Sequence, residues 1–497
     1  MEIKLKGSSN GLEPRPAILR DGVFACSESS RRVIIGGMIK ITFLGGAQEV
    51  TGANHLVEYS SPDSTQTGKL LIDCGMFQGT KTCEDQNHEP FGFSPKEIDV
   101  LFITHAHLDH IGRIPKLVKE GFKGKIISTP PTKDLAELSL VDSMGILKKE
   151  AEREKREPPY TEEEVRKAME IWETSLYGET IHLAGVKAVF MEAGHILGSA
   201  MVELVFGRGE SEKKVVFSGD LGNPPTPLLK DPYDLTDADY LIIESTYGSK
   251  EHEGREERKL KLERAIEDTI KSGGVLMIPA FSIERTQELL FELNDLVENG
   301  RINQVPIFLD SPLAIKATAI YKKYESYFNQ EVKYVINSGD DIFKFPGLKF
   351  CLRTEESKAI NNVEPPKVVI AGSGMSTGGR IVHHEKRYLP DANSTLLLMS
   401  YQAAGSLGRQ IEDGAKWVTI LGDKIPVNAR VLEIKGYSSH PDVNGLFSLV
   451  EKNSDKLKKV FVVQGEPHSA LFFAQKVKDY LGIEAAAPAR GESATLE

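Results

Sequence analysis

The chain has 497 residues, of which 40% are hydrophobic and 27% charged, with a formal net charge of −11 and four cysteines. This length predicts two domains, and the composition is that of a soluble globular protein. The acidic balance argues against non-specific binding of duplex DNA, no apolar run reaches the ~20 residues of a membrane span, and widely spaced cysteines without a signal-peptide pattern favour reduced thiols in the cytoplasm.

Residues 1–37 show no strong periodicity, and we expect a poorly ordered extension without an assigned role. The first predicted strand spans residues 39–46, where apolar and polar side chains alternate. Strand-like apolar runs recur at six further places, namely 69–73, 100–104, 125–127, 186–191, 215–217 and 240–243. Several end in a polar or acidic residue, and the active sites of layered α/β folds commonly lie at that edge of a sheet.

Residues 133–174 are rich in Ala, Glu and Lys and predict a helical insertion that is interrupted at Pro158 and Pro159. A second strand and helix pattern begins near residue 250, with helices at 255–270 and 284–298 and strands at 274–278, 306–309 and 368–370. Further strands follow at 430–434 and 460–463. Because ligand-like residues occur on both sides of this block, we predict a catalytic domain over 38–248 and 439–497, with a second domain inserted at 249–438.

A cluster of metal-binding residue types follows the predicted strand at 100–104. The segment Thr104-His105-Ala106-His107-Leu108-Asp109-His110 holds three of the 12 histidines in the chain. Imidazole and carboxylate together suit zinc, and this array can face two metal ions at once. Downstream, His195 lies between glycines and Asp220 follows the strand at 215–217. Each is also typical of a turn when taken alone, but together with the array they form a candidate ligand set.

These motifs resemble a known family. Asp73 in Leu-Ile-Asp-Cys-Gly, the 104–110 array, His195 and Asp220 resemble the four motifs of the metallo-β-lactamase fold. Four later motifs resemble its β-CASP branch of ribonuclease J-like exonucleases and the endonuclease that trims pre-mRNA before polyadenylation: Glu244-Ser245-Thr246-Tyr247-Gly248, Pro279-Ala280-Phe281-Ser282, Gly374-Met375-Ser376-Thr377-Gly378-Gly379-Arg380 and Ser438-Ser439-His440. The resemblance covers nearly everything from Met38 onward and implies an αββα sandwich with an inserted α/β domain.

The resemblance also implies a role for each residue. One zinc ion would be bound by His105, His107 and His195 and a second by Asp109 and His110, with Asp220 bridging them and Asp73 orienting the ligands or the bridging water. Two zinc ions ~3.5–4 Å apart generate hydroxide near neutral pH and clamp both oxygens of an in-line phosphoryl displacement. With Asp109, the predicted catalytic residues are His440 as general acid and Glu244 as its hydrogen-bond partner. The Ser-Ser-His-Pro segment at 438–441 is also typical of a helix start.

The sequence departs from the family at one position. Family members usually carry a Val-His-Gly-Glu motif after the general acid, whose histidine completes the second zinc site. Here the matching segment is Val463-Gln464-Gly465-Glu466. A glutamine amide is a poorer zinc ligand than imidazole, and His468 would replace it only if the loop bends. Weak occupancy of the second site, a different preferred metal and reduced activity are all consistent with this change.

The inserted domain carries residues that suit an RNA phosphate. The glycine-rich segment 372–380 runs into a predicted helix at 381–387, and backbone N–H groups at such a junction bind phosphate. The candidate phosphate contacts are Ser282, Arg285, Ser373, Gly374, Arg380 and His384. Ordinary loop closure explains the glycines equally well.

The sequence therefore predicts a zinc-dependent ribonuclease that hydrolyses phosphodiester bonds of single-stranded RNA. The motifs leave exonuclease or endonuclease action open, and a homodimer or an RNA-processing complex is typical of relatives. One alternative is a metal hydrolase of a small ester or phosphodiester substrate, which would not need the large inserted block. The other is a catalytically weakened RNA-binding subunit, which Gln464 favours and the otherwise intact ligand set opposes.

Overall fold

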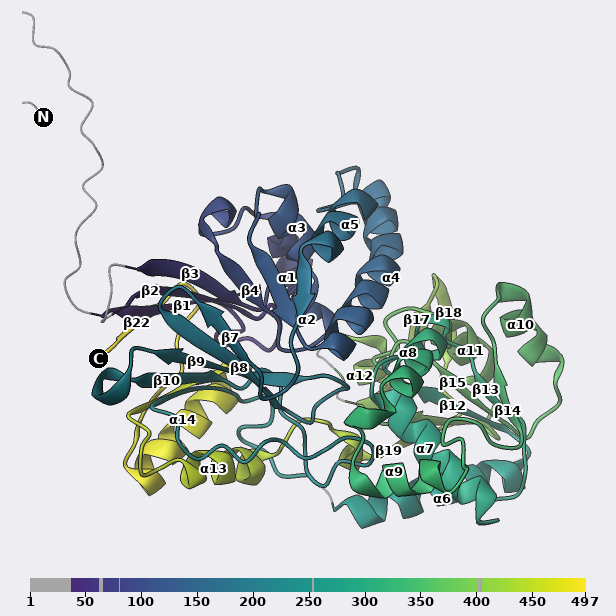
Figure 1. Ribbon diagram of the computed structural model, residues 1–497. Helices are drawn as coiled ribbons and strands as arrows, with labels where there is room; N and C mark the ends of the chain where they lie inside the picture. The colour runs from purple at the N-terminus through teal and green to yellow at the C-terminus, as the bar shows by residue number, and fades with distance from the viewer. Residues whose placement is uncertain (1–36, 62–65, 80, 253, 401, 403–404) are drawn as a thin grey trace, which may run out of the picture. The chain divides into compact units, whose positions relative to one another are not determined.

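The computed structural model of the chain describes residues 37–61, 66–79, 81–252, 254–400, 402 and 405–497. The predicted extension, apart from residue 37, lies outside the described residues. Two seven-stranded sheets and one six-stranded sheet organise the described residues. The two seven-stranded sheets face each other and carry helices on their outer sides. Together with these helices they form a four-layered αββα sandwich (Figure 1).

The first sheet has the strand order β22-β1-β2-β3-β4-β5-β6. Its members are β1 (Ile39–Gly45), β2 (Asn54–Ser60), β3 (Thr67–Ile72), β4 (Val100–Phe102), β5 (Lys125–Ser128), β6 (Trp172–Thr174) and β22 (Ser493–Leu496). The outer helices of this sheet are α1 (Lys81–Asp85), α2 (Leu108–Ile111), α3 (Ile114–Lys119), α4 (Pro130–Glu154) and α5 (Glu162–Glu170). The predicted helical insertion is thus two helices and a short strand, separated near the predicted proline break.

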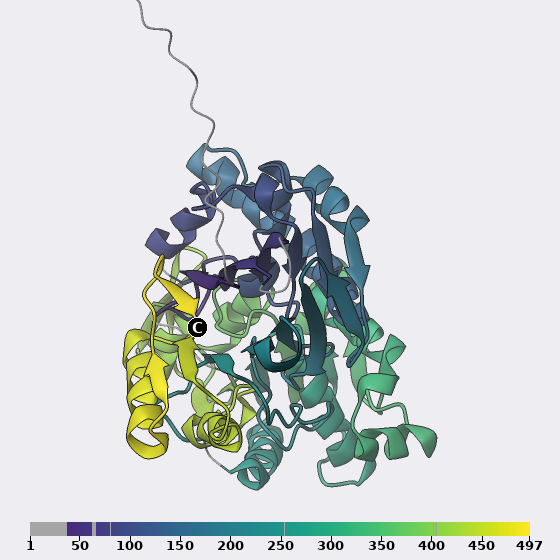
Figure 2. The same ribbon diagram turned by 60° about the vertical axis from the view of Figure 1, so that its left-hand side comes forward.

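The second sheet has the order β21-β20-β11-β10-β9-β8-β7. Its members are β7 (Thr180–Leu183), β8 (Val186–Glu192), β9 (Ala200–Phe206), β10 (Lys213–Phe217), β11 (Tyr240–Glu244), β20 (Lys459–Val463) and β21 (Glu484–Ala486). Helices α13 (Val443–Lys452) and α14 (Pro467–Leu481) cover its outer face, and both views show them on that side (Figure 1, Figure 2). Apolar side chains such as Phe102 and Phe190 pack between the two sheets.

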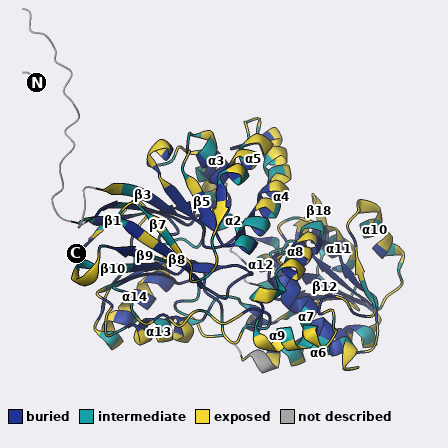
Figure 3. Cartoon of the chain, viewed as in Figure 1, coloured by how far each residue is buried: buried dark blue, intermediate teal, exposed yellow. Residues whose placement is uncertain are grey.

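The third sheet lies between β11 and β20 in the chain, although these two strands are direct parallel neighbours. Its order is β14-β13-β15-β12-β16-β19, from β12 (Val275–Pro279), β13 (Ile307–Leu309), β14 (Leu348–Phe350), β15 (Lys367–Ala371), β16 (Thr395–Leu398) and β19 (Arg430–Glu433). Its helices and hairpin are α6 (Arg255–Ser272), α7 (Arg285–Glu298), α8 (Pro312–Lys323), α9 (Gln330–Asn337), α10 (Thr354–Ala359), α11 (Ile381–Tyr388), α12 (Leu407–Glu412), β17 (Trp417–Ile420) and β18 (Asp423–Pro426). Helix α7 is largely buried (Figure 3). The α/β fold class is confirmed, while the exact domain boundaries stay a prediction.

Every strand predicted from an apolar run is present, within a few residues at either end. Strand β2 was not predicted, because its Asn54 and His55 interrupt the apolar pattern although both are buried. Among the helices of the described part of the chain, none combines the length and apolar character that a bilayer crossing requires.

Candidate metal centre and catalytic site

The ends of parallel strands gather the candidate residues. Strands β3 and β4 run parallel in the first sheet, so Asp73 and the 104–110 array emerge at one edge. Strands β10, β11 and β20 run parallel in the second sheet, so Asp220, Glu244 and Gln464 emerge at one edge as well. Close packing of these loops requires Gly75, since a Cβ there would lie 1.5 Å from the carbonyl oxygen of Asp109.

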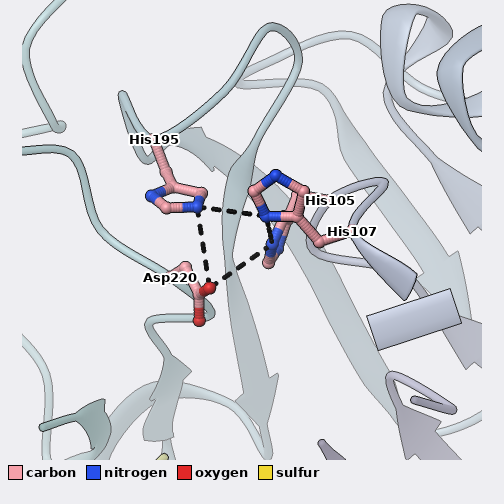
Figure 4. Close-up of side chains that lie close together, drawn as sticks. All are labelled: His105, His107, His195 and Asp220. Atoms are coloured by element: carbon pink, nitrogen blue, oxygen red, sulfur yellow. Dashed lines mark hydrogen bonds and ion pairs between the residues drawn. The ribbon is translucent and has the colours of Figure 1, made fainter. Parts of the chain in front are cut away.

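Four side chains form the first ligand group, shown in Figure 4: His105, His107, His195 and Asp220. Nδ1 of His107 lies 3.1 Å from Nε2 of His105 and 3.3 Å from Nε2 of His195. Oδ2 of Asp220 lies 3.5 Å and 3.6 Å from the Nε2 atoms of His105 and His195. A tetrahedral zinc ion with bonds of ~2.0–2.1 Å separates its ligand atoms by about 3.3 Å. The four atoms therefore fit a zinc ion.

Burial keeps these imidazoles neutral. It lowers the pKa of His105 and His195 well below the usual range and that of His107 to about 4. A neutral imidazole offers the lone pair that binds a metal, so this environment suits ligands.

The second ligand group contains Asp109, His110 and Asp220. Nε2 of His110 lies 3.3 Å from Oδ1 of Asp220 and 3.9 Å from Oδ2 of Asp109. Asp220 thus presents one carboxylate oxygen to each group and lies between them. Burial would lower the pKa of His110, but the carboxylates of Asp220 and Asp73 outweigh it and raise this pKa well above its usual range.

Asp73 orients His110. Its carboxylate accepts hydrogen bonds from the backbone N–H of Thr104 at 2.8 Å and the Thr104 hydroxyl at 2.8 Å, and it lies 2.7 Å from Nδ1 of His110. This contact turns Nε2 of His110 toward Asp220, as carboxylates behind metal-binding histidines commonly do. Asp73 has a left-handed backbone with φ +61°, a strain of about 1–3 kcal/mol that is typical of functional sites.

The buried Glu244 and the partly exposed His440 form a pair next to the first ligand group. Nδ1 of His440 lies 2.9 Å and 3.0 Å from the two carboxylate oxygens of Glu244, which also accepts a 2.7 Å bond from the N–H of Leu221. The His440 and His195 rings are 4.6 Å apart. Burial alone would lower the pKa of His440, but Glu244 and then Asp220 and Asp109 raise it to about 9. The helix start predicted for this segment comes three residues later, because α13 begins at Val443 and is capped by Asp442.

The predicted phosphate contacts do not form a single cluster. Arg285 donates a 2.8 Å hydrogen bond to the hydroxyl of Ser439, beside His440. Arg380 and His384 instead both contact Asp310, each at 2.7 Å, and Arg380 also donates to two backbone carbonyls. The roles of these residues stay predictions.

The other three predicted phosphate contacts, Ser282, Ser373 and Gly374, each lie within hydrogen-bond distance of another residue. The Ser282 hydroxyl lies 3.2 Å from that of Ser311, and the Ser373 hydroxyl lies 3.1 Å from that of Thr377. The Gly374 carbonyl accepts a 3.0 Å bond from Gln402.

His468 does not replace the missing histidine, because it is exposed on the first turn of α14, where its ring contacts Phe472. It is absent from the gathered ligand atoms of the described residues.

Three supporting residues were missed in the sequence. His252 lies with Nε2 3.0 Å from the His440 carbonyl, and Tyr321 accepts a 3.2 Å bond from the N–H of Leu197, two positions from His195. Neither residue has a signal in its local pattern. Asp310 does have one, because it follows β13 directly, as Asp73 follows β3.

The αββα sandwich, with a histidine and aspartate ligand set at its strand ends, defines a metal-dependent hydrolase. The chain belongs to the metallo-beta-lactamase superfamily and its β-CASP branch. It matches the metallo-beta-lactamase superfamily over residues 56–264, the Beta-Casp domain over 286–411 and the Zn-dependent metallo-hydrolase RNA specificity domain over 424–488.

Its relatives include named RNA enzymes. The chain is 37% identical to Ribonuclease TTHA0252 of Thermus thermophilus, covering 87% of this chain and 94% of that protein. It is 34% identical to an RNase J-like protein of Methanocaldococcus jannaschii, covering 91% and 99%, and 33% identical to Transcription termination factor FttA of the same organism, covering 90% and 70%. A crystal structure of a protein of unknown function from Enterococcus faecalis shares the fold, with TM-score 0.55, 12% identity and coverage of 92% and 100%.

Proposed function

We propose that this chain is a zinc-dependent ribonuclease that hydrolyses phosphodiester bonds of single-stranded RNA. One observation carries the proposal: His440, held by Glu244, lies beside the first ligand group, with its ring 4.6 Å from that of His195. A proton donor next to a zinc site is the combination that hydrolysis of a phosphodiester needs, because water must be activated and the leaving oxygen protonated.

The roles of the residues follow from their positions. Zinc bound by the first ligand group would supply Lewis-acid activation of water and of the phosphodiester. His440 is protonated at neutral pH because its pKa is about 9, so it donates its proton to the leaving 3′-oxygen. Glu244 stabilises the imidazolium before that transfer. The downstream RNA fragment then carries a 5′-phosphate.

Two findings support RNA as the substrate. Residues 424–488 match a domain named for RNA specificity, and relatives covered almost over their whole length are named ribonuclease and RNase J-like. The termination factor relative is covered over only 70% of its length, so ribonuclease activity is the function favoured here. A single strand leaves the phosphodiester accessible, whereas the grooves of an RNA duplex restrict access.

The test uses RNA labelled at either end, the same RNA as a duplex, single-stranded DNA of the same sequence, and a small chromogenic ester, all with added zinc. The parent is expected to cleave the single-stranded RNA, while His105→Ala loses cleavage. His468→Ala is the matched control and should cleave like the parent, because His468 is exposed and outside the ligand groups. Product lengths separate trimming from internal cuts. Binding of RNA without cleavage by the parent would instead support the weakened RNA-binding subunit, and cleavage of small esters alone would support the other alternative.

A further inference from the structure

Gln464 lies inside the second ligand group. It follows strand β20 directly, and only 3% of its surface is exposed. Its amide nitrogen lies 2.9 Å from Nε2 of His110 and 2.5 Å from Oδ1 of Asp220. These are the atoms that His110 and Asp220 would offer to a second metal ion, so the amide already binds both.

The backbone of Gln464 fixes the side chain in this position. Its N–H donates to the carbonyl of Gly46 at 2.5 Å, and its carbonyl accepts from the hydroxyl of Thr246 at 3.1 Å. A Cβ on Gly46 would lie 3.1 Å from Cγ of Gln464, which shows how closely the side chain is packed. The residue also has a left-handed backbone, with φ +48°. An unfavourable backbone conformation persists only where its surroundings enforce it.

The two ligand groups differ in how their polar atoms are satisfied. In the first group, three imidazole nitrogens and a carboxylate oxygen face one another at 3.1–3.6 Å, the separations expected of atoms that share a zinc ion. In the second group, hydrogen bonds run from Thr104 through Asp73, His110 and Gln464 to Asp220. Both contacts are made by Nε2 of Gln464, whose two hydrogens can be donated to Oδ1 of Asp220 and to a hydrogen-free Nε2 of His110. The second group is therefore internally bonded, whereas the first is arranged for a cation.

A second zinc ion would have to break both amide contacts. From Gln464 it would gain only an amide oxygen, which suits hard cations better than zinc. We infer that Gln464 closes the second metal site and that the protein holds one tightly bound zinc ion, at His105, His107, His195 and Asp220. The inference rests on the proposed zinc site, but its test counts metal ions and does not depend on RNA cleavage.

In the experiment, the metal-free chain is titrated with zinc in a calorimeter, and the bound zinc per chain is measured after dialysis. The parent is expected to retain one zinc ion and Gln464→His two, since the imidazole replaces the amide with a good zinc ligand. Gln48→His is the matched control, because Gln48 also has a left-handed backbone, with φ +55°, but its amide donates to the carbonyl of Ala487 and not to Asp220 or His110. It should retain one zinc ion.

Removing Asp109 from the new site gives a second check: Gln464→His with Asp109→Asn should return to one zinc ion. Two zinc ions of similar affinity on the parent, or one on a folded Gln464→His, would overturn the inference. If Gln464→His does not fold, Gln464→Glu decides, because a carboxylate of nearly the same size also binds metal and should give two ions. A parent that binds no zinc would remove the proposed zinc site itself, which is a different failure.

Discussion

Nδ1 of His440 lies 2.9 Å from Oε1 of Glu244, although the two residues are 196 positions apart. Glu244 ends β11, the last strand before the inserted segment, whereas His440 follows that segment and precedes α13. The pair therefore forms only when the chain returns correctly from the third sheet to the second. The candidate general acid therefore reaches its position only when the second and the third sheet have both folded.

Replacement of His440 by Ala should reduce the cleavage rate by about 10²–10⁴-fold, the usual contribution of a positioned general acid. Glu244→Gln should cause a smaller loss, because it removes the charge that stabilises the imidazolium. Single-turnover kinetics measure both. Since Glu244 acts through His440, the double variant should be no slower than His440→Ala alone. Additive losses in the double variant would contradict the assigned relationship.

Zinc should stabilise the folded protein. Binding to the native state alone adds about 2.7 kcal/mol at a free zinc concentration roughly one hundred times the Kd. Thermal unfolding with zinc and with a chelator measures the difference in Tm. His107→Ala should abolish most of it, because His107 lies between His105 and His195 in the first ligand group. His182→Ala, an exposed position on β7, should respond to zinc as the parent does. An unchanged zinc effect in His107→Ala would exclude the first ligand group as the site.

Sequence patterns predicted most of the candidate metal ligands because these residues directly follow recognisable strands. Asp73, the 104–110 array and Asp220 follow apolar runs, and the parallel order of β3 with β4 and of β10 with β11 brings them to shared edges. The position of Gln464 followed from its motif, but not its contacts with His110 and Asp220, which depend on the packing of loops far apart in the chain. The split of the phosphate candidates between Ser439 and Asp310 is likewise a tertiary feature that spacing does not encode.

The hydroxyl of Tyr321 connects the inserted α/β segment to the loop of His195. It accepts a 3.2 Å bond from the N–H of Leu197 and donates a 2.5 Å bond to Glu284, and all of its surface is buried. Tyr321→Phe removes two buried hydrogen bonds, although the Leu197 N–H and the Glu284 carboxyl still contact each other, so the free energy of unfolding should fall by about 1 kcal/mol. Zinc affinity should fall as well, because Leu197 helps to hold the loop of His195. Chemical denaturation and a zinc titration measure the two effects.

Tyr334→Phe is the control for this variant, since Tyr334 is 77% exposed and has the same hydroxyl to lose. A Tyr321→Phe protein with parental zinc affinity and lower stability would limit Tyr321 to a structural role. Parental values of both quantities would mean that the hydroxyl supports neither.

Glu385 should make stability depend on pH. It lies on α11, where its carboxyl accepts a 2.5 Å hydrogen bond from Ser376, and burial raises its pKa from 4.5 to about 7. Because the folded-state pKa is the higher one, the stabilisation from the neutral acid is complete below pH 4.5 and is lost as pH rises through 7. That loss amounts to about 3 kcal/mol. Glu385→Gln keeps the shape and the bond from Ser376 without titrating. Between pH 4.5 and 8, the free energy of unfolding of Glu385→Gln should therefore rise by this amount relative to that of the parent. Denaturant unfolding at each pH measures both. The exposed Glu355→Gln should show no such gain, and a constant difference between Glu385→Gln and the parent across this range would contradict the prediction.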